Sequence, residues 1–282
     1  MKIKKNKPIW LKVRFPIGVK YDKINNLLLK ESLNTICKSS DCPNIGTCWK
    51  NGVLSFLLLG NICTRSCKFC AIKTGKPKTI NVLEPYKIAK TVKKMEMKHV
   101  VLTSVNRDDL KDMGIKIWIK TIREIKKIST STIEALIPDF KGHKKNIALI
   151  IKEHPEIISH NLETVPRLTQ KVCIQGKYDR SLSILKYIKT KSDIRTKTGL
   201  MLGIGETEVE VINTFKDIRK SNIDILTIGQ YLPPTLKHYP VKSFITPQKF
   251  QDYKNIALDM GFLYVESNPL VRSSYNASKH II

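Results

Sequence analysis

Cysteines are the residues whose type and spacing most directly indicate chemistry in this chain. Six of its seven cysteines fall within 34 residues, in two groups of three. In a chain without features of export, clustered thiols favour metal binding or catalysis over structural disulfides. The first group is spaced C-x4-C-x5-C (Cys37, Cys42, Cys48) and the second C-x3-C-x2-C (Cys63, Cys67, Cys70).

The second group directly follows a short apolar run, residues 53–59, that reads as a strand. Three thiolates on such a loop can hold three corners of a cubane iron–sulfur cluster, which leaves one iron free to chelate a small molecule. A zinc site would require a fourth ligand, usually from a second C-x2-C-type pair, and no such pair is present. This spacing is the signature of radical S-adenosylmethionine enzymes.

The first group lies in the segment CKSSDCPNIGTCW, where Pro43 and Gly46 bend the chain so that three thiols can converge. Again three cysteines stand where a cluster needs four ligands. Two groups therefore predict two clusters, each incomplete in cysteine. Cys173 stands alone, and we interpret it as a buried structural thiol.

Short apolar runs alternate with amphipathic stretches along the rest of the chain. Helices are predicted over residues 84–97, 115–128 and 247–260, and Thr207 with Glu210 forms a capping box that opens another. Six β–α units predict an α/β fold, a partial (β/α)6 TIM-type barrel with N- and C-terminal extensions. The six predicted strands are residues 53–59, 99–103, 132–137, 157–160, 198–202 and 223–228.

Three regions follow from this pattern. Residues 1–50 form an N-terminal extension with the first cysteine group, residues 51–245 form the barrel, and residues 246–282 form a C-terminal helix and tail that cap it. Working residues of such barrels lie on the loops after the strands. One active face is therefore predicted from residues 61–70, 104–109, 138–140, 161–164, 203–206 and 230–231.

The paired cysteine groups, together with the final motif RSSY, resemble the lipoyl synthase family of radical S-adenosylmethionine enzymes. Supporting segments are CPNIGTCW, TSVNRDDL, IEALIPDF, HNLETVPRL, KTGLMLGIGET and LTIGQYLPPT. None of the departures from the family pattern is a cluster ligand; they are Thr47, Asn61, Ser66, Asn106, Met113, Asn268 and Asn276.

The resemblance implies two 4Fe–4S clusters and S-adenosylmethionine as cofactors. It implies a sulfurtransferase that inserts two sulfur atoms at C6 and C8 of a protein-bound octanoyl group. Neither carbon adjoins a carbonyl, so a base cannot remove a proton there and hydrogen-atom abstraction is the available route. The resemblance implies that a 5′-deoxyadenosyl radical abstracts the hydrogen atoms and that the auxiliary cluster supplies the sulfur. The family also implies Ser274 as the fourth auxiliary ligand, with Ser273 as the alternative. The implied catalytic residues are Cys63, Cys67, Cys70 and Ser274.

Contacts to the cofactor are predicted at strand ends. The ribose or the methionine end of the cofactor is expected to bind Thr103, Ser104, Asn161 and Glu163. Its carboxylate is expected to pair with Arg195. Arg107, with the two aspartates that follow it, is either part of the site or an ion-pair cluster within a loop.

The formal net charge of +26, from 50 Lys and Arg against 24 Asp and Glu, favours acidic partners. Expected partners are octanoylated lipoyl carrier domains (2-oxoacid dehydrogenase acyltransferase subunits and the glycine cleavage H protein) and a low-potential electron donor such as flavodoxin or ferredoxin. The basic residues are spread along the chain without a nucleic-acid-binding motif, so neither nucleic acid nor membrane is expected as a partner. With no apolar run long enough to span a bilayer and no export signal, a cytoplasmic location is expected.

Two alternatives remain open from the residues alone. The first is another sulfur-inserting radical enzyme, such as a methylthiotransferase or a biotin-synthase-like protein. The second is a zinc-stabilised nucleic-acid-binding protein, which the charge and the clustered cysteines would also suit.

Overall fold

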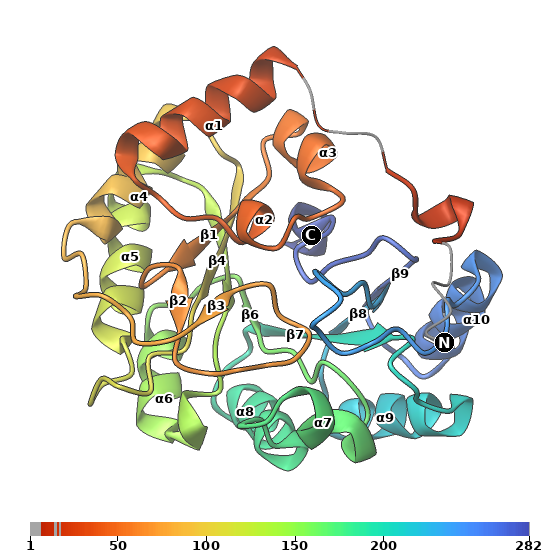
Figure 1. The fold of residues 1–282 in the computed structure, drawn as a ribbon. Helices are drawn as coiled ribbons and strands as arrows, with labels where there is room; N and C mark the ends of the chain where they lie inside the picture. The colour runs from red at the N-terminus through yellow and green to blue at the C-terminus, as the bar shows by residue number, and fades with distance from the viewer. Residues whose placement is uncertain (1–6, 14–15, 17, 282) are drawn as a thin grey trace.

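The computed structural model describes residues 7–13, 16 and 18–281 and is built around one parallel sheet (Figure 1). Its seven strands lie in chain order, apart from a small separate sheet of β2 (Ile62–Cys63) and β3 (Lys73–Thr74). The strands of the main sheet are β1 (Leu54–Leu58), β4 (His99–Ser104), β5 (Thr132–Leu136), β6 (Ile157–Ser159), β7 (Arg195–Leu202), β8 (Ile225–Gln230) and β9 (Tyr264–Ser267).

Helices cover the outer side of this sheet (Figure 1). The outer helices are α4 (Glu84–Lys94), α5 (Ile115–Ile128), α6 (Lys144–Lys152), α7 (Pro166–Val172), α8 (Tyr178–Lys191), α9 (Glu208–Lys220) and α10 (Pro247–Asp259). The N-terminal part contributes α1 (Val19–Glu31), α2 (Ile36–Ser39) and α3 (Ile45–Lys50), and there are 3-10 turns η1 (Ile9–Leu11), η2 (Phe140–Gly142) and η3 (Ala277–Ile281).

The predicted α/β fold, a partial barrel of β–α units, is confirmed. Every neighbouring pair of main-sheet strands is parallel, and among the described strands β1 is not paired with β9. All six predicted strands are present, with ends that differ by a few residues. A seventh strand, β9, was not predicted, because it has only four residues and only Val265 among them is buried.

The core forms because both faces of the central strands are covered. In β4, His99 and the three apolar residues after it are all buried, which suits a strand with helices on one side and the barrel interior on the other. Helix α5 buries Ile122 and Ile125 of its predicted apolar stripe, together with Trp118, whereas the predicted Ile119 is only partly buried. The predicted capping box of α9 is also confirmed.

A buried ion pair joins β5 and β7. Lys197 Nζ lies 2.9 Å from Glu134 Oε2, and their side chains are 1% and 0% exposed. Ser159 Oγ donates to the other carboxylate oxygen at 2.8 Å.

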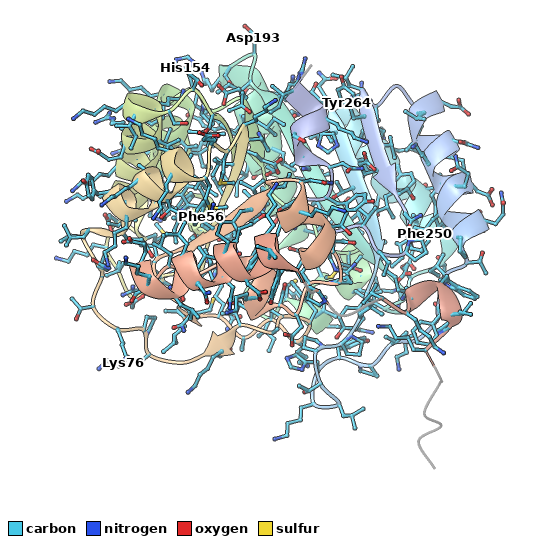
Figure 2. All side chains as sticks on the ribbon, turned by 90° about the horizontal axis from the view of Figure 1, so that it is seen from above. Phe56, Lys76, His154, Asp193, Phe250 and Tyr264 are labelled. Atoms are coloured by element: carbon cyan, nitrogen blue, oxygen red, sulfur yellow. The ribbon has the colours of Figure 1, made fainter. Side chains whose placement is uncertain are left out.

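The N-terminal extension is joined to the edge of the barrel at β1. Thr35 Oγ1 donates to Ser55 O at 2.8 Å and accepts from the amide of Cys37, the first residue of the first cysteine group. In Figure 2, His154 and Asp193 lie at one end of the molecule, Lys76 lies toward the other, and Phe56 is covered by the N-terminal helices. The cysteines of the extension thus lie beside the loops that follow the strands.

Residues 1–6, 14, 15 and 17 of the predicted extension, and residue 282 of the predicted tail, lie outside the described residues. The division at residues 50 and 245 stays a prediction. Within the described part of the chain, no helix combines the length and the apolar character needed to cross a bilayer.

Candidate functional site

A cavity of about 560 Å³ opens at the carboxyl ends of the strands and is lined by both cysteine groups. Five of the six predicted active-face loops contribute to its wall; among the described residues, only the loop at 203–206 does not. The predicted site residues that line it are Cys37, Cys42, Cys48, Cys63, Cys67, Cys70, Thr103, Ser104, Asn161, Glu163, Ser273 and Ser274. Thiols separated by as much as 33 positions in the sequence therefore face one space.

The second cysteine group suits an iron–sulfur cluster. Cys63 Sγ accepts hydrogen bonds from the amides of Arg65 and Asn106, each at 3.4 Å, and such bonds to sulfur tune cluster ligands. Within the described residues, no three His, Cys, Asp or Glu side chains are close enough to hold a single metal ion. Cys63, Cys67 and Cys70 all line the same cavity, and a cubane would be held there at three of its irons.

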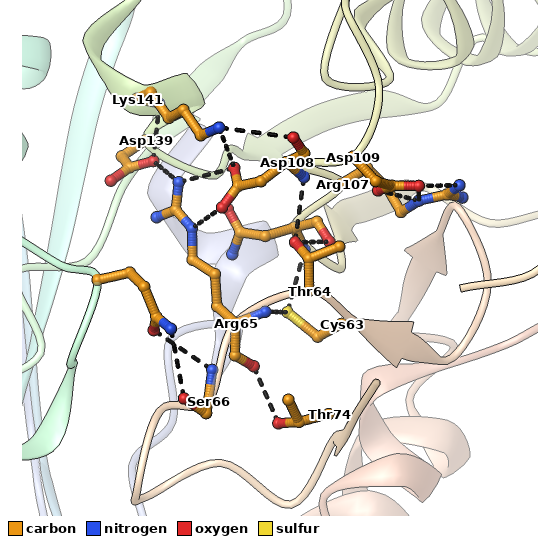
Figure 3. A network of polar contacts seen from close by, with 12 residues as sticks. Cys63, Thr64, Arg65, Ser66, Thr74, Arg107, Asp108, Asp109, Asp139 and Lys141 are labelled. Atoms are coloured by element: carbon orange, nitrogen blue, oxygen red, sulfur yellow. Dashed lines mark hydrogen bonds and ion pairs between the residues drawn. The ribbon is translucent and has the colours of Figure 1, made fainter. Parts of the chain in front are cut away.

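The loop that carries this group is fixed by a buried arginine (Figure 3). Arg65 lies between Cys63 and Cys67, and its side chain is 6% exposed. Its Nε and Nη2 donate to Asp108 at 2.6 and 3.0 Å, and Nη2 also lies 2.8 Å from Asp139 Oδ1. These carboxylates follow β4 and β5, so one guanidinium joins the cysteine loop to two strands.

Asp139 is the centre of this network. Its other oxygen forms an ion pair with Arg180 Nη2 at 2.6 Å, and its Oδ1 accepts a hydrogen bond from the amide of Lys141 at 2.9 Å. Although burial acts in the opposite direction, the hydrogen bonds and charge of Arg65 lower the pKa of Asp139 to about 2. The aspartate is therefore ionised at every physiological pH.

The neighbouring Arg107 pairs with Asp109 at 2.9 Å and not with Asp108 (Figure 3). None of these three residues lines the cavity in the described part of the chain. The structure thus favours the loop ion-pair interpretation of Arg107.

The predicted cofactor contacts lie at two strand ends. Thr103 and Ser104 end β4, where Trp118 Nε1 donates to Ser104 Oγ at 3.2 Å. Glu163, beyond β6, has a left-handed backbone with φ of 69°, held by hydrogen bonds with Gly199 O and the amide of Met201. Burial raises the pKa of Glu163 to about 7, while its hydrogen bond with Asn161 acts in the other direction.

Arg195 is the one predicted site residue that the structure does not bring to the cavity. Strand β7 begins at residue 195, not 198, so this side chain lies at the amino end of the strand. Its Nη1 donates to His280 O at 2.7 Å. The predicted contact between Arg195 and the cofactor carboxylate is therefore corrected, because the residue is at the opposite end of the barrel.

Two thiols of the first group, Cys42 and Cys48, have raised pKa values. Burial raises the pKa of Cys48 to about 12, and the charges of Cys42 and Cys37 act in the same direction; burial also raises the pKa of Cys42. In the second group, burial raises the pKa of Cys70 to about 12. Metal binding by Cys42, Cys48 and Cys70 must therefore release protons.

The C-terminal RSSY motif meets this cavity beside the first group. Ser273 Oγ accepts from Asn161 Nδ2 at 2.7 Å. Among the described residues, no hydrogen bond involves the hydroxyl of Ser274, which also lines the cavity. Asn44, between Cys42 and Cys48, donates to Leu270 O at 2.6 Å. The choice of Ser274 over Ser273 as a ligand stays a prediction.

The sequence alone did not predict that Cys173, Arg272, Lys7 and Arg65 line this cavity. Cys173 is buried as expected, but it also lines the cavity and its side chain hydrogen-bonds with that of Cys67. Arg272 and Lys7 are cations in the wall near the first group. Of these residues, only Arg65 could have been predicted as part of the site from the local sequence, because it is a charged residue between two cysteines.

Comparison with known proteins agrees with this geometry. Residues 57–218 match the family described as the Radical SAM superfamily. The chain is 63% identical to a lipoyl synthase of Karelsulcia muelleri, over 100% of this chain and 99% of that protein. It is 56% identical to a lipoyl synthase of Flavobacterium psychrophilum, over 98% and 96% of the two chains. It is 53% identical to a mitochondrial lipoyl synthase of Nematostella vectensis, over 98% and 95%.

Solved structures agree on the fold. Methylornithine synthase (PylB) matches with a TM-score of 0.58 and 12% identity, over 89% of this chain and 82% of that one. HydG, a maturase of the [FeFe]-hydrogenase, matches with a TM-score of 0.58 and 12% identity, over 94% and 79%. The radical superfamily implies a 4Fe–4S cluster and S-adenosylmethionine, so the zinc-binding alternative is set aside. The chain belongs to the lipoyl synthase family of radical S-adenosylmethionine enzymes, sulfurtransferases that form the lipoyl group by inserting two sulfur atoms into an octanoyl group.

Proposed function

We propose that the sulfur inserted at C6 and C8 of the protein-bound octanoyl group comes from a second 4Fe–4S cluster, held by Cys37, Cys42, Cys48 and Ser274. The observation that carries this proposal is the shared cavity, which both cysteine groups and Ser274 line. A substrate carbon bound there lies within reach of both groups.

Cys63, Cys67 and Cys70 would hold the first cluster, which the superfamily implies. Together with S-adenosylmethionine it supplies the one-electron chemistry that an unactivated C–H bond requires. The residues of this chain bind and orient the reactants. The ion pairs of Arg65 with Asp108 and Asp139 keep the cysteine loop in place.

Polar groups at the ends of β4 and β6 would orient S-adenosylmethionine through its ribose and methionine end. These are Thr103, Ser104, Asn161 and Glu163. Apolar side chains on the same wall suit an octanoyl chain and exclude water from a radical reaction. They include Phe69, Leu136, Ile137, Leu162, Met201 and Leu232.

The expected partners are octanoylated lipoyl carrier domains of 2-oxoacid dehydrogenases and the glycine cleavage H protein, and a flavodoxin or ferredoxin as electron donor. Acidic surfaces on such proteins would complement a chain of net charge +26. Lys7 and Lys177 in the cavity wall are suited to the approach of a carrier domain that presents its octanoyl-lysine.

Anaerobic reconstitution followed by mass spectrometry tests this proposal. Iron and acid-labile sulfide of about eight each per chain are expected from two clusters. Incubation with S-adenosylmethionine, a reductant and an octanoylated carrier peptide should give a product with two added sulfur atoms. Iron of about four per chain, or fully loaded protein that forms no two-sulfur product, would contradict it.

A further inference from the structure

We propose that Gly229 and Ser273 are positioning residues, which dock the C-terminal tail so that Ser274 reaches the auxiliary cluster. The inference rests on the proposed function, in which Ser274 is a cluster ligand. Neither residue touches the reacting atoms in this account. They act by fixing the segment on either side of Ser274.

Position 229 requires glycine because a neighbouring backbone leaves no room for a side chain, and not because of the backbone conformation of residue 229. It lies in β8 opposite Met201, and its φ is not in the left-handed region. A Cβ built at this position would lie 2.1 Å from Val271 O and 3.0 Å from Val271 C. Because both are backbone atoms, no side-chain rotation relieves the overlap. Any larger residue must push the tail away from β8.

The tail is tied down on either side of this contact. Before it, the amide of Gln230 donates to Pro269 O at 3.1 Å, and Asn44 Nδ2 donates to Leu270 O at 2.6 Å. After it, Asn161 Nδ2 donates to Ser273 Oγ at 2.7 Å. The tail therefore bridges the loop of the first cysteine group and the loop after β6.

Ser274 itself is held by the turn that follows. The amide of Tyr275 donates to Arg272 O at 2.8 Å, which encloses Ser273 and Ser274 in a tight turn. No hydrogen bond involves the Ser274 hydroxyl among the described residues, so the backbone around it sets its position. A hydroxyl binds iron weakly beside thiolates, so its ligation depends on this preorganisation.

The test uses full-length, anaerobically reconstituted protein and measures the rate at which iron is lost to a chelator. The variants are Gly229→Ala, Ser273→Ala and, as the reference, Ser274→Ala. Gly75→Ala is the matched control, because its Cβ would meet only Ile62 Cγ2 at an ordinary 3.6 Å. Two clusters should release iron in two kinetic phases. A variant with Cys63, Cys67 and Cys70 all replaced by alanine lacks the first cluster, so the phase that remains in it belongs to the auxiliary cluster.

Ser274→Ala, Gly229→Ala and Ser273→Ala should each accelerate auxiliary iron loss by about tenfold, the effect of roughly one lost hydrogen bond or ligand contact. The Gly229→Ala/Ser274→Ala double variant should be no faster than the single variants, since both changes remove one interaction. Gly75→Ala should lose auxiliary iron at the rate of the unaltered protein. In every one of these variants, the rate of iron loss from the first cluster should not change. Ser273→Thr, which keeps the hydroxyl, should restore the slow rate and so separates positioning from loss of folding.

Each other result is decisive. If Ser274→Ala releases iron faster but Gly229→Ala and Ser273→Ala match the unaltered protein, the docking proposal is wrong and the proposed function stands. The docking proposal is equally wrong if Gly229→Ala accelerates both phases together and Ser273→Ala accelerates neither. If Ser274→Ala has no effect, both the docking proposal and the ligand assignment fail.

Discussion

Replacement of Asp139 by asparagine should destabilise the protein through the buried network at the second cysteine group. The carboxylate is 4% exposed and bonds with Arg65 at 2.8 Å and Arg180 at 2.6 Å. In Asp139→Asn, one oxygen can still accept from one arginine, but the amide nitrogen would face the other arginine as donor against donor. One guanidinium then loses its ion pair with residue 139 and keeps only its other acceptor, which is Asp108 for Arg65 and Gln175 O for Arg180.

The magnitude follows from the pKa of Asp139, which falls from an ordinary 3.8 to about 2. Nearly two units correspond to about 2.5 kcal/mol, and direct measurements on broken buried pairs give roughly 3–5 kcal/mol. A loss of about 2.5 kcal/mol from the free energy of unfolding lowers Tm by about 5 °C in a chain of this length. The folded-state pKa is depressed, so this stabilisation is present above pH 4 and is lost only as pH falls through about 2. The deficit of the variant should therefore be constant between about pH 6 and pH 9.

Thermal unfolding of the reconstituted protein and its variants measures this effect. Asp179→Asn is the matched control, because Asp179 is exposed in the first turn of α8; its change should stay within about 0.5 kcal/mol. Asp139→Asn should also weaken retention of the first cluster and leave the auxiliary cluster intact. The reasoning is refuted if Asp139→Asn unfolds at the same temperature as Asp179→Asn, or if its deficit disappears on raising the pH from 6 to 9.

Other predictions concern the cofactor, the serine ligand, the partner and the thiols. Because the pKa of Glu163 is about 7, its carboxylate ionises as pH rises from 6 to 8, and the Kd for S-adenosylmethionine should fall over that range; equal pH dependence in Glu163→Gln would contradict a role for its charge. Ser274→Cys should keep about eight irons but transfer sulfur roughly tenfold more slowly, since thiolate binds iron more strongly than a hydroxyl does; unchanged single-turnover rates would count against a labile ligand. Affinity for an octanoylated carrier domain should drop about tenfold from low to high salt, and a salt-independent Kd would exclude docking by charge. In cluster-free protein, Cys48 and Cys70, each with a pKa of about 12, should resist alkylation at pH 8; rapid labelling of both would show that burial does not control them.

The strands and helices could be predicted wherever the local pattern is strong. Helix α5 agrees at both ends with the prediction, because its apolar stripe is regular. Strand β7 was predicted three residues short, because the buried polar residues Thr196 and Lys197 hide its beginning. That error also misplaced Arg195 at the cofactor. Alternation of apolar and polar residues cannot reveal a strand whose buried face carries an ion pair.

The cysteine groups could be predicted because their chemistry is set by spacing within one loop. The residues that support them could not, because their partners are distant in sequence. Arg65 meets Asp108 across 43 positions, and Asn161 meets Ser273 across 112. Gly229 has no turn or left-handed backbone to explain it, and only the approach of Val271 shows why a side chain is absent there.

The most direct test of the account is to separate the two cysteine groups in one assay. Cys37, Cys42 and Cys48 are replaced together by alanine, and the protein is incubated with S-adenosylmethionine, reductant and octanoylated peptide. This variant should hold about four irons per chain, should continue to cleave S-adenosylmethionine reductively and should add no sulfur to the peptide. A peptide that still gains two sulfur atoms would contradict the claim that the first cysteine group holds the sulfur source.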